Sequence, residues 1–87
     1  MSTWCIKLNA KSNKAVRKAV FTLSLLGYKL INPLDNKQTT VVVWSDKDIA
    51  VTWQHEHDVS TMADETFFYT SRKEFIAEVK RLQETTK

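Results

Sequence analysis

The chain has 87 residues, of which 43% are hydrophobic and 26% charged, with one glycine, one proline and one cysteine. This length allows a single domain, 1–87, and the composition is that of a globular protein, which argues against a disordered chain. A single cysteine excludes an internal disulfide and is typical of a reducing cytosol. No apolar run approaches the roughly 18 residues that span a bilayer, and no secretion signal is visible, so we expect a cytoplasmic protein without a membrane partner.

The charges are segregated along the chain. Residues 1–30 carry six lysine and arginine side chains and no carboxylate, residues 31–70 have a net charge of −5, and residues 71–87 have a net charge of +2. Segregated charge creates a field that steers a charged partner toward one side of a small domain.

The first predicted elements are a strand and a helix. Apolar and polar side chains alternate through residues 3–8, which predicts a half-buried strand. Apolar residues then recur at spacings of three and four through residues 13–26. This spacing predicts a helix that Ser12 or Asn13 caps and that Gly27 ends.

The middle of the chain predicts a hairpin. Asn32-Pro33 is a turn signal, residues 39–44 are β-branched and aromatic, and residues 49–54 alternate in polarity after a polar turn. Residues 55–65 are acidic and irregular, and residues 66–69 predict a short edge strand or an extended lead-in.

The last predicted element is a helix that reaches residue 84. Ser71 and Glu74 have the spacing of a capping box, and an apolar stripe follows them. The order β-α-β-β-(β)-α predicts an α+β fold of two layers, in which both helices cover one face of a mostly antiparallel sheet of three or four strands.

Positive side chains gather at the start of the first helix. Lys14, Arg17 and Lys18 are spaced i, i+3, i+4 and therefore project together, and Lys11 precedes the cap. Cations there oppose the helix dipole at a cost of about 0.3–1 kcal/mol each, so helix stability does not explain them. They form either a surface that binds an anionic partner or a solvated face that keeps the protein soluble. For the first alternative the candidate binding residues are Lys7, Lys11, Lys14, Arg17, Lys18, Trp44 and Trp53.

Tryptophans are the candidate anchors of that partner. Residues 41–44 are apolar on both sides of their strand, so the sheet face without helices is a candidate sticky surface, with Trp44 and Trp53 near it. The alternative is a second small core beneath residues 55–65.

Catalytic and metal-binding patterns are weak. His55 and His57 share one side of an extended segment and have the chemistry of zinc ligands, with Asp58 or Asp64 as further ligands. No second ligand pair of fixed spacing accompanies them. Exposed loop residues, or a charge switch near the histidine pKa of about 6.5, explain the pair equally well. Cys5 lies inside a strand and one glycine cannot form a phosphate cradle, so we expect neither an enzyme nor a cofactor.

Three short motifs carry a resemblance to a known group. The chain resembles a diffuse group of small bacteriophage accessory proteins in Trp4-Cys5-Ile6-Lys7, in the helix end Leu26-Gly27-Tyr28, and in Tyr69 followed by Glu74-Phe75-Ile76. The resemblance implies an α+β domain in the cytoplasm of an infected bacterium. It also implies a protein that binds and blocks a host factor, such as a restriction system, a toxin or another defence.

Two functional hypotheses follow. The first is a non-enzymatic inhibitor or modulator, whose basic helix face steers it to a host protein with an acidic or nucleic-acid-bearing surface. The alternative is a protein that binds RNA or DNA through the same basic face. A homodimer formed through an uncovered sheet face is compatible with both.

Overall fold

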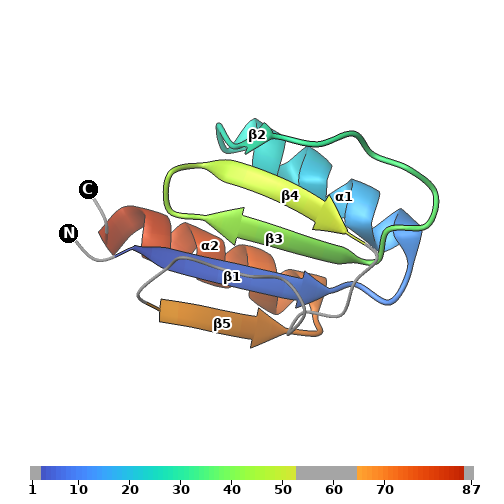
Figure 1. Ribbon diagram of the computed structural model, residues 1–87. Coiled ribbons are helices and arrows are strands. Elements are labelled where there is room, and N and C mark those ends of the chain that lie inside the picture. The colour runs from blue at the N-terminus through green and yellow to red at the C-terminus, as the bar shows by residue number, and fades with distance from the viewer. Residues whose placement is uncertain (1–2, 53–64, 86–87) are drawn as a thin grey trace.

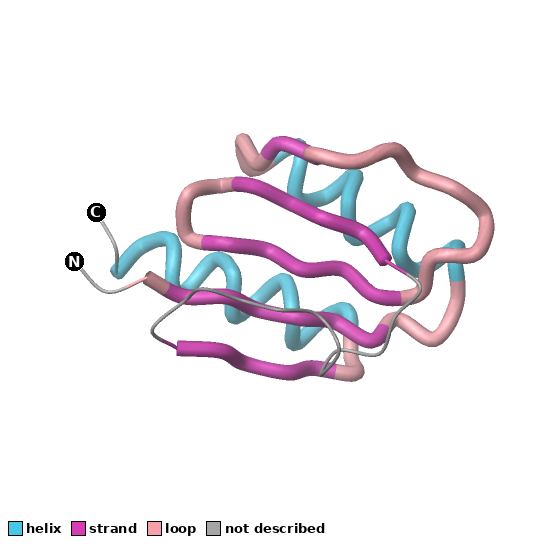
Figure 2. The backbone as a smooth tube through the Cα atoms, viewed as in Figure 1, coloured by secondary structure: helices cyan, strands magenta, loops and turns pink. Residues whose placement is uncertain are grey.

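A computed structural model describes residues 3–52 and 65–85 of the chain (Figures 1 and 2). The strands form one five-stranded sheet in the order β2-β4-β3-β1-β5, and the two helices lie on the same face of it (Figure 1). Neither of these helices is long and apolar enough to cross a membrane. The elements in chain order are β1 (Trp4–Asn9), α1 (Asn13–Leu25), β2 (Lys29–Leu30), β3 (Thr40–Trp44), β4 (Asp48–Thr52), β5 (Glu65–Tyr69) and α2 (Arg72–Thr85).

The sheet is mixed. β1 and β4 each pair antiparallel with β3, whereas β1 pairs parallel with β5 and β2 pairs parallel with β4. The expected α+β class is therefore confirmed, but the expectation of a mostly antiparallel sheet with three or four strands is wrong. The physical reason is that β4 and β5 run in the same direction, and a hairpin turn cannot connect two parallel strands. The alternation of polarity along a strand carries no information about the direction of that strand in the sheet.

Strand β2 is the element that the expected order lacked. It has only two residues, held where the backbone N–H of Lys29 donates to Lys47 O at 2.8 Å and that of Ile31 donates to Ile49 O at 2.9 Å. Asn32 extends this pairing, because its side-chain amide donates to Val51 O at 2.8 Å and accepts from Val51 N at 2.9 Å. The next residue, Pro33, has no backbone N–H to offer.

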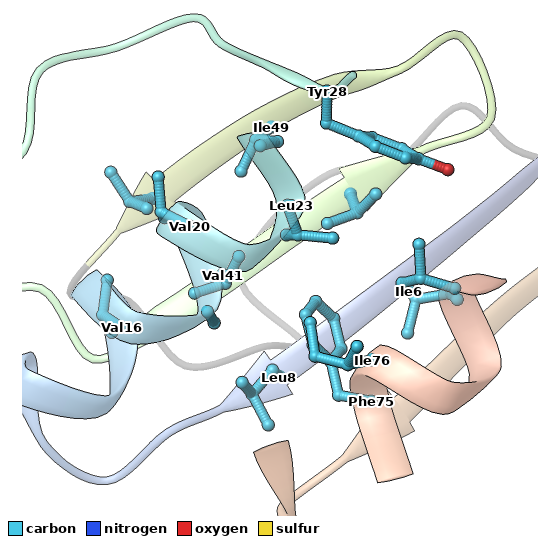
Figure 3. Packing of buried hydrophobic residues seen from close by; sticks show 14 of the residues in the cluster. Ile6, Leu8, Val16, Val20, Leu23, Tyr28, Val41, Ile49, Phe75 and Ile76 are labelled. Carbon is cyan, nitrogen blue, oxygen red and sulfur yellow. The ribbon is translucent and has the colours of Figure 1, made fainter. Parts of the chain in front are cut away.

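The hydrophobic core lies between the sheet and the helices (Figure 3). Alternate residues of β1, β3 and β4 face the helices, and each helix contributes a stripe of apolar residues with helical spacing, as expected. The helical side of this core consists of Val16, Ala19, Val20 and Leu23 from α1 and Phe75, Ile76, Val79 and Leu82 from α2.

The helix ends agree with the sequence signals. Ser12 Oγ accepts a hydrogen bond from Ala15 N at 3.2 Å, and Ser71 Oγ accepts one from Glu74 N at 3.4 Å. Gly27 follows α1 with a φ of 94°, in the left-handed region that glycine favours. The Ser12 cap fixes where α1 begins, and therefore which side chains lie in its first turn.

Candidate partner-binding surface

The packing of α1 places its basic residues on the outer surface of the molecule. Its buried stripe rests on the sheet, so the opposite side of the helix faces away from the core. Lys14, Arg17 and Lys18 are exposed there, and Lys11 is exposed just before the cap. Four of the candidate binding residues therefore gather at one end of α1.

Hydrogen bonds fasten the loop between β2 and β3 to the first turn of α1. Asn13 Nδ2 donates to Asp35 O at 2.7 Å and to Gln38 O at 3.1 Å. Arg17 Nε donates to Asn13 Oδ1 at 2.8 Å, and Arg17 Nη2 donates to Asp35 O at 3.4 Å. Arg17 is thus oriented by neutral oxygens and keeps its positive charge at the surface.

The same loop adds another cation to this end of α1. Asp35 Oδ1 accepts from the backbone N–H of Lys37 at 2.8 Å and of Gln38 at 3.1 Å, so this oxygen is used within its own loop. Lys37 is exposed beside these contacts. Sequence reasoning missed Lys37 because it lies in the net-acidic middle of the chain, and only the contact between loop and helix reveals it. We call the group Lys11, Lys14, Arg17, Lys18 and Lys37 the basic end of α1.

The charge of the basic end is not cancelled by ion pairs. Within residues 3–52 and 65–85, no salt bridge joins any of its members to a carboxylate, whereas Arg81 on α2 pairs with Glu78. α1 itself contains no Asp or Glu. The surface is therefore electropositive, and it will attract negatively charged groups.

Two large apolar side chains continue the outer face of α1. Phe21 is 67% exposed and Leu25 is 73% exposed. Lys14, Lys18, Phe21 and Leu25 follow one another at spacings of four, three and four, which keeps them on one side of the helix. Sequence reasoning missed Phe21 and Leu25, although the signal was present, since both are apolar residues outside the buried stripe. We call Phe21 and Leu25 the apolar end of α1.

The remaining candidate residues do not join this surface. Lys7 alternates with the core residues of β1, so it lies on the sheet face away from the helices. It is only 3% exposed, and its Nζ lies 5.1 Å from the centroid of the Phe68 ring. Trp44 is half-buried on that same face, opposite Cys5. Trp53 lies outside the described residues.

The sheet face without helices has buried residues at its centre. Val42 and Cys5 lie there and are completely buried. Val42 is therefore not part of an exposed apolar surface, but Phe68, which pairs with Lys7 on this face, is 53% exposed. The homodimer through this face stays a prediction. The alternative, a second small core beneath residues 55–65, involves a segment that lies almost entirely outside the described residues.

The chemistry of Cys5 is that of a buried thiol. Burial raises the pKa of this thiol to about 11. The positive charge of Lys7 lowers the pKa, but this effect is smaller than that of burial. The thiol is therefore protonated at neutral pH, whereas the thiolate is the nucleophilic form.

Metal ligation was considered at His55 and His57, with Asp58 or Asp64 as further ligands. All four residues lie outside the described part of the chain. Among the residues that the structure does describe, no group of three His, Cys, Asp or Glu side chains is placed to hold a metal ion.

Comparisons of the chain with protein-family models, with curated proteins and with solved structures gave no match.

Proposed function

We propose that the protein is a non-enzymatic binding module, which inhibits or modulates a partner protein by occupying its surface. The outer face of α1 is the contact surface in this proposal. Its single strongest support is the basic end of α1, where five exposed cations gather without a salt bridge to a described carboxylate. The resemblance to bacteriophage accessory proteins makes a bacterial host factor, such as a defence enzyme or a toxin, the class of partner that we propose.

Electrostatics supports an anionic partner. Lys14 lies in the first turn of α1, where the backbone N–H groups and the helix dipole are already positive. A carboxylate of the partner would interact favourably with the side chains and the dipole together. Complementary charge of this kind also raises association rates, from about 10⁵–10⁶ M⁻¹s⁻¹ toward 10⁸ M⁻¹s⁻¹ at low salt.

Nucleic acid is the second candidate partner. The basic end offers the lysine and arginine side chains that phosphates bind, which favours this alternative. Binding to nucleic acid releases counterions, so its affinity falls steeply as salt rises. A protein partner bound through apolar contacts as well as charge has a weaker dependence on salt.

A quantitative pull-down from bacterial lysate, with and without nuclease, tests the proposal. The wild-type protein is compared with the triple variant Lys14→Glu, Arg17→Glu, Lys18→Glu, whose three sites are exposed. We expect the wild type to enrich a specific protein in nuclease-treated lysate and the triple variant to lose it. Circular dichroism should show that both proteins are folded.

The matched control carries the same change of charge on the other helix. Arg72→Glu, Lys73→Glu and Lys80→Glu alter three exposed cations of α2. This control should retain the partner, because the change leaves α1 intact. Equal loss in both variants would mean that only net charge matters, and retention by the α1 variant would overturn the proposed surface. Capture that disappears after nuclease treatment would favour nucleic acid instead.

A further inference from the structure

We infer that the outer face of α1 binds an acidic amphipathic helix of the partner protein, with carboxylates against the basic end and apolar side chains against the apolar end. This inference rests on the proposed function and names the element of the partner that would be recognised. It is carried by a separate observation, the exposure of Phe21 and Leu25 at 67% and 73%.

The apolar end extends the basic surface along the helix. Single exposed apolar residues are common on protein surfaces. Phe21 and Leu25, however, stand on successive turns of one side of α1, directly after Lys14 and Lys18 on that side. Phenylalanine is enriched at protein interfaces, so Phe21 is a suitable anchor for apolar residues of a partner, and Leu25 extends the apolar area beside it. The neighbouring cations select a partner with carboxylates.

The length of the surface fits a short helix. Lys14 and Leu25 are eleven positions apart in α1, which corresponds to about 16 Å at the helical rise of 1.5 Å per residue. A partner helix of about three turns covers this distance. Helices that bind along a surface in this way do so through residues spaced i, i+3, i+4 and i+7.

A second copy of the chain fits this surface poorly. α1 contains no carboxylate, so packing α1 against α1 of another copy would bring two sets of cations together. Like charges at an interface are repulsive and cost binding energy. The occupant must therefore supply negative charge that this helix lacks.

Lipid and nucleic acid also fit less well than an acidic helix. A helix that lies in a membrane surface needs a broad apolar face, but the apolar stripe of α1 is already buried against the sheet. Nucleic acid would use the basic end and stack bases on aromatic rings. Leu25 has no ring on which a base can stack, so its exposure is not explained by nucleic acid.

Titration of the ¹⁵N-labelled protein with defined probes tests the inference. The first probe is a 14-residue helical peptide with glutamates and leucines at helical spacing, and the second is the same peptide with every leucine replaced by glutamine. The others are a single-stranded oligonucleotide of 20 thymidines and vesicles of anionic phospholipid. We expect the Glu/Leu peptide to bind at least tenfold more tightly than the Glu/Gln peptide, with amide shifts along residues 14–25.

Variants of the apolar end separate this inference from the proposed function. Phe21→Gln with Leu25→Gln should abolish the tenfold preference for the Glu/Leu peptide, while weak binding of both acidic peptides persists. Ile31→Gln is the matched control, because it removes an apolar side chain that is 55% exposed outside α1. This control should keep the full preference.

Each of the remaining outcomes would overturn either the inference alone or the inference together with the proposed function. Equal affinity for the two peptides would overturn the inference and leave the proposed acidic protein partner in place. Binding of neither peptide, or tighter binding of the oligonucleotide or the vesicles than of the Glu/Leu peptide, would overturn both. A preference that survives in the double variant would show that the apolar contact lies elsewhere and would also overturn the inference.

Discussion

Lys14 is the residue at which the proposed binding of an anionic partner and the stability of α1 oppose each other. It occupies the first turn of α1, which contains no acidic residue, and its side chain is exposed. A positive charge at this point opposes the positive end of the helix dipole. Lys14, which we propose to attract an anionic partner, therefore weakens the helix that carries it.

Lys14→Glu should stabilise the isolated protein by about 0.5–1 kcal/mol, because it replaces an unfavourable charge with a favourable one. Urea denaturation at low salt measures this change, and added salt should reduce it. The control is Lys18→Glu, one turn further along, where the dipole effect has largely fallen off. A loss of stability in Lys14→Glu, or an equal gain in Lys18→Glu, would contradict this explanation.

Cys5 should make the stability of the protein fall at high pH. Burial holds the native pKa of the thiol at about 11, whereas an exposed thiol has a pKa of about 9.0. Below pH 9 both states keep the proton and Cys5 adds no pH dependence. Between pH 9 and 11 the unfolded state releases its proton first, so the unfolding free energy falls, by about 1–2 kcal/mol near pH 10.5.

Comparison with Cys5→Ala isolates this effect from other titrating groups. The difference in unfolding free energy between wild type and Cys5→Ala should be constant below pH 8.5 and should shrink as pH rises to 10.5. A difference that stays constant over the whole range would mean that the native thiol ionises as readily as the unfolded one.

At the scale of elements, Gly27 determines how α1 ends. Its φ of 94° is one that L residues rarely adopt, while a Cβ at this position would meet only Lys47 Nζ, at 3.9 Å. Gly27→Ala should therefore destabilise the protein by about 1–2 kcal/mol through backbone strain alone. Gly27→Asn should cost less, because asparagine tolerates the left-handed region better. Denaturant midpoints measure both variants, and an Ala variant as stable as wild type would contradict the argument.

Local patterns were sufficient to predict most elements. The helix expected at 13–26 is α1 at Asn13–Leu25, and the helix expected at 71–84 is α2 at Arg72–Thr85. Both follow from apolar spacing and from caps, which are properties of neighbouring residues. Strand β2 was not predictable because two residues are too few to show alternation, and its pairing with β4 depends on contacts distant in sequence.

The direction of β5 was not predictable for a related reason. Its pairing with β1 joins residues about 60 positions apart, and no local pattern records whether such a pair is parallel. The residues of the candidate surface were also predictable only where local spacing determines their position. Helical spacing was sufficient to group Lys14, Arg17 and Lys18. Lys37 joins them only through contacts between the loop and the helix that are distant in sequence. The burial of Lys7 was not predictable because alternation along a strand does not show how deeply each sheet face is buried.

In the whole molecule, the two faces of the sheet differ in what covers them and in which side chains they expose. One face carries both helices (Figure 1). The basic and apolar ends of α1 are exposed on the side of this helix that faces away from the sheet. On the other face Val42 and Cys5 are buried, and Phe68 is exposed. We therefore propose that a partner protein binds on the outer face of α1.

Site-specific photocrosslinking tests this claim most directly. Benzoylphenylalanine replaces Phe21 on α1 in one protein and Ala77 on the exposed side of α2 in another. After irradiation in nuclease-treated bacterial lysate, we expect a discrete protein adduct from position 21 only. The adduct should disappear when Lys14, Arg17 and Lys18 are changed to Glu. An adduct formed only from position 77, or one from position 21 that survives the charge reversal, would contradict the account.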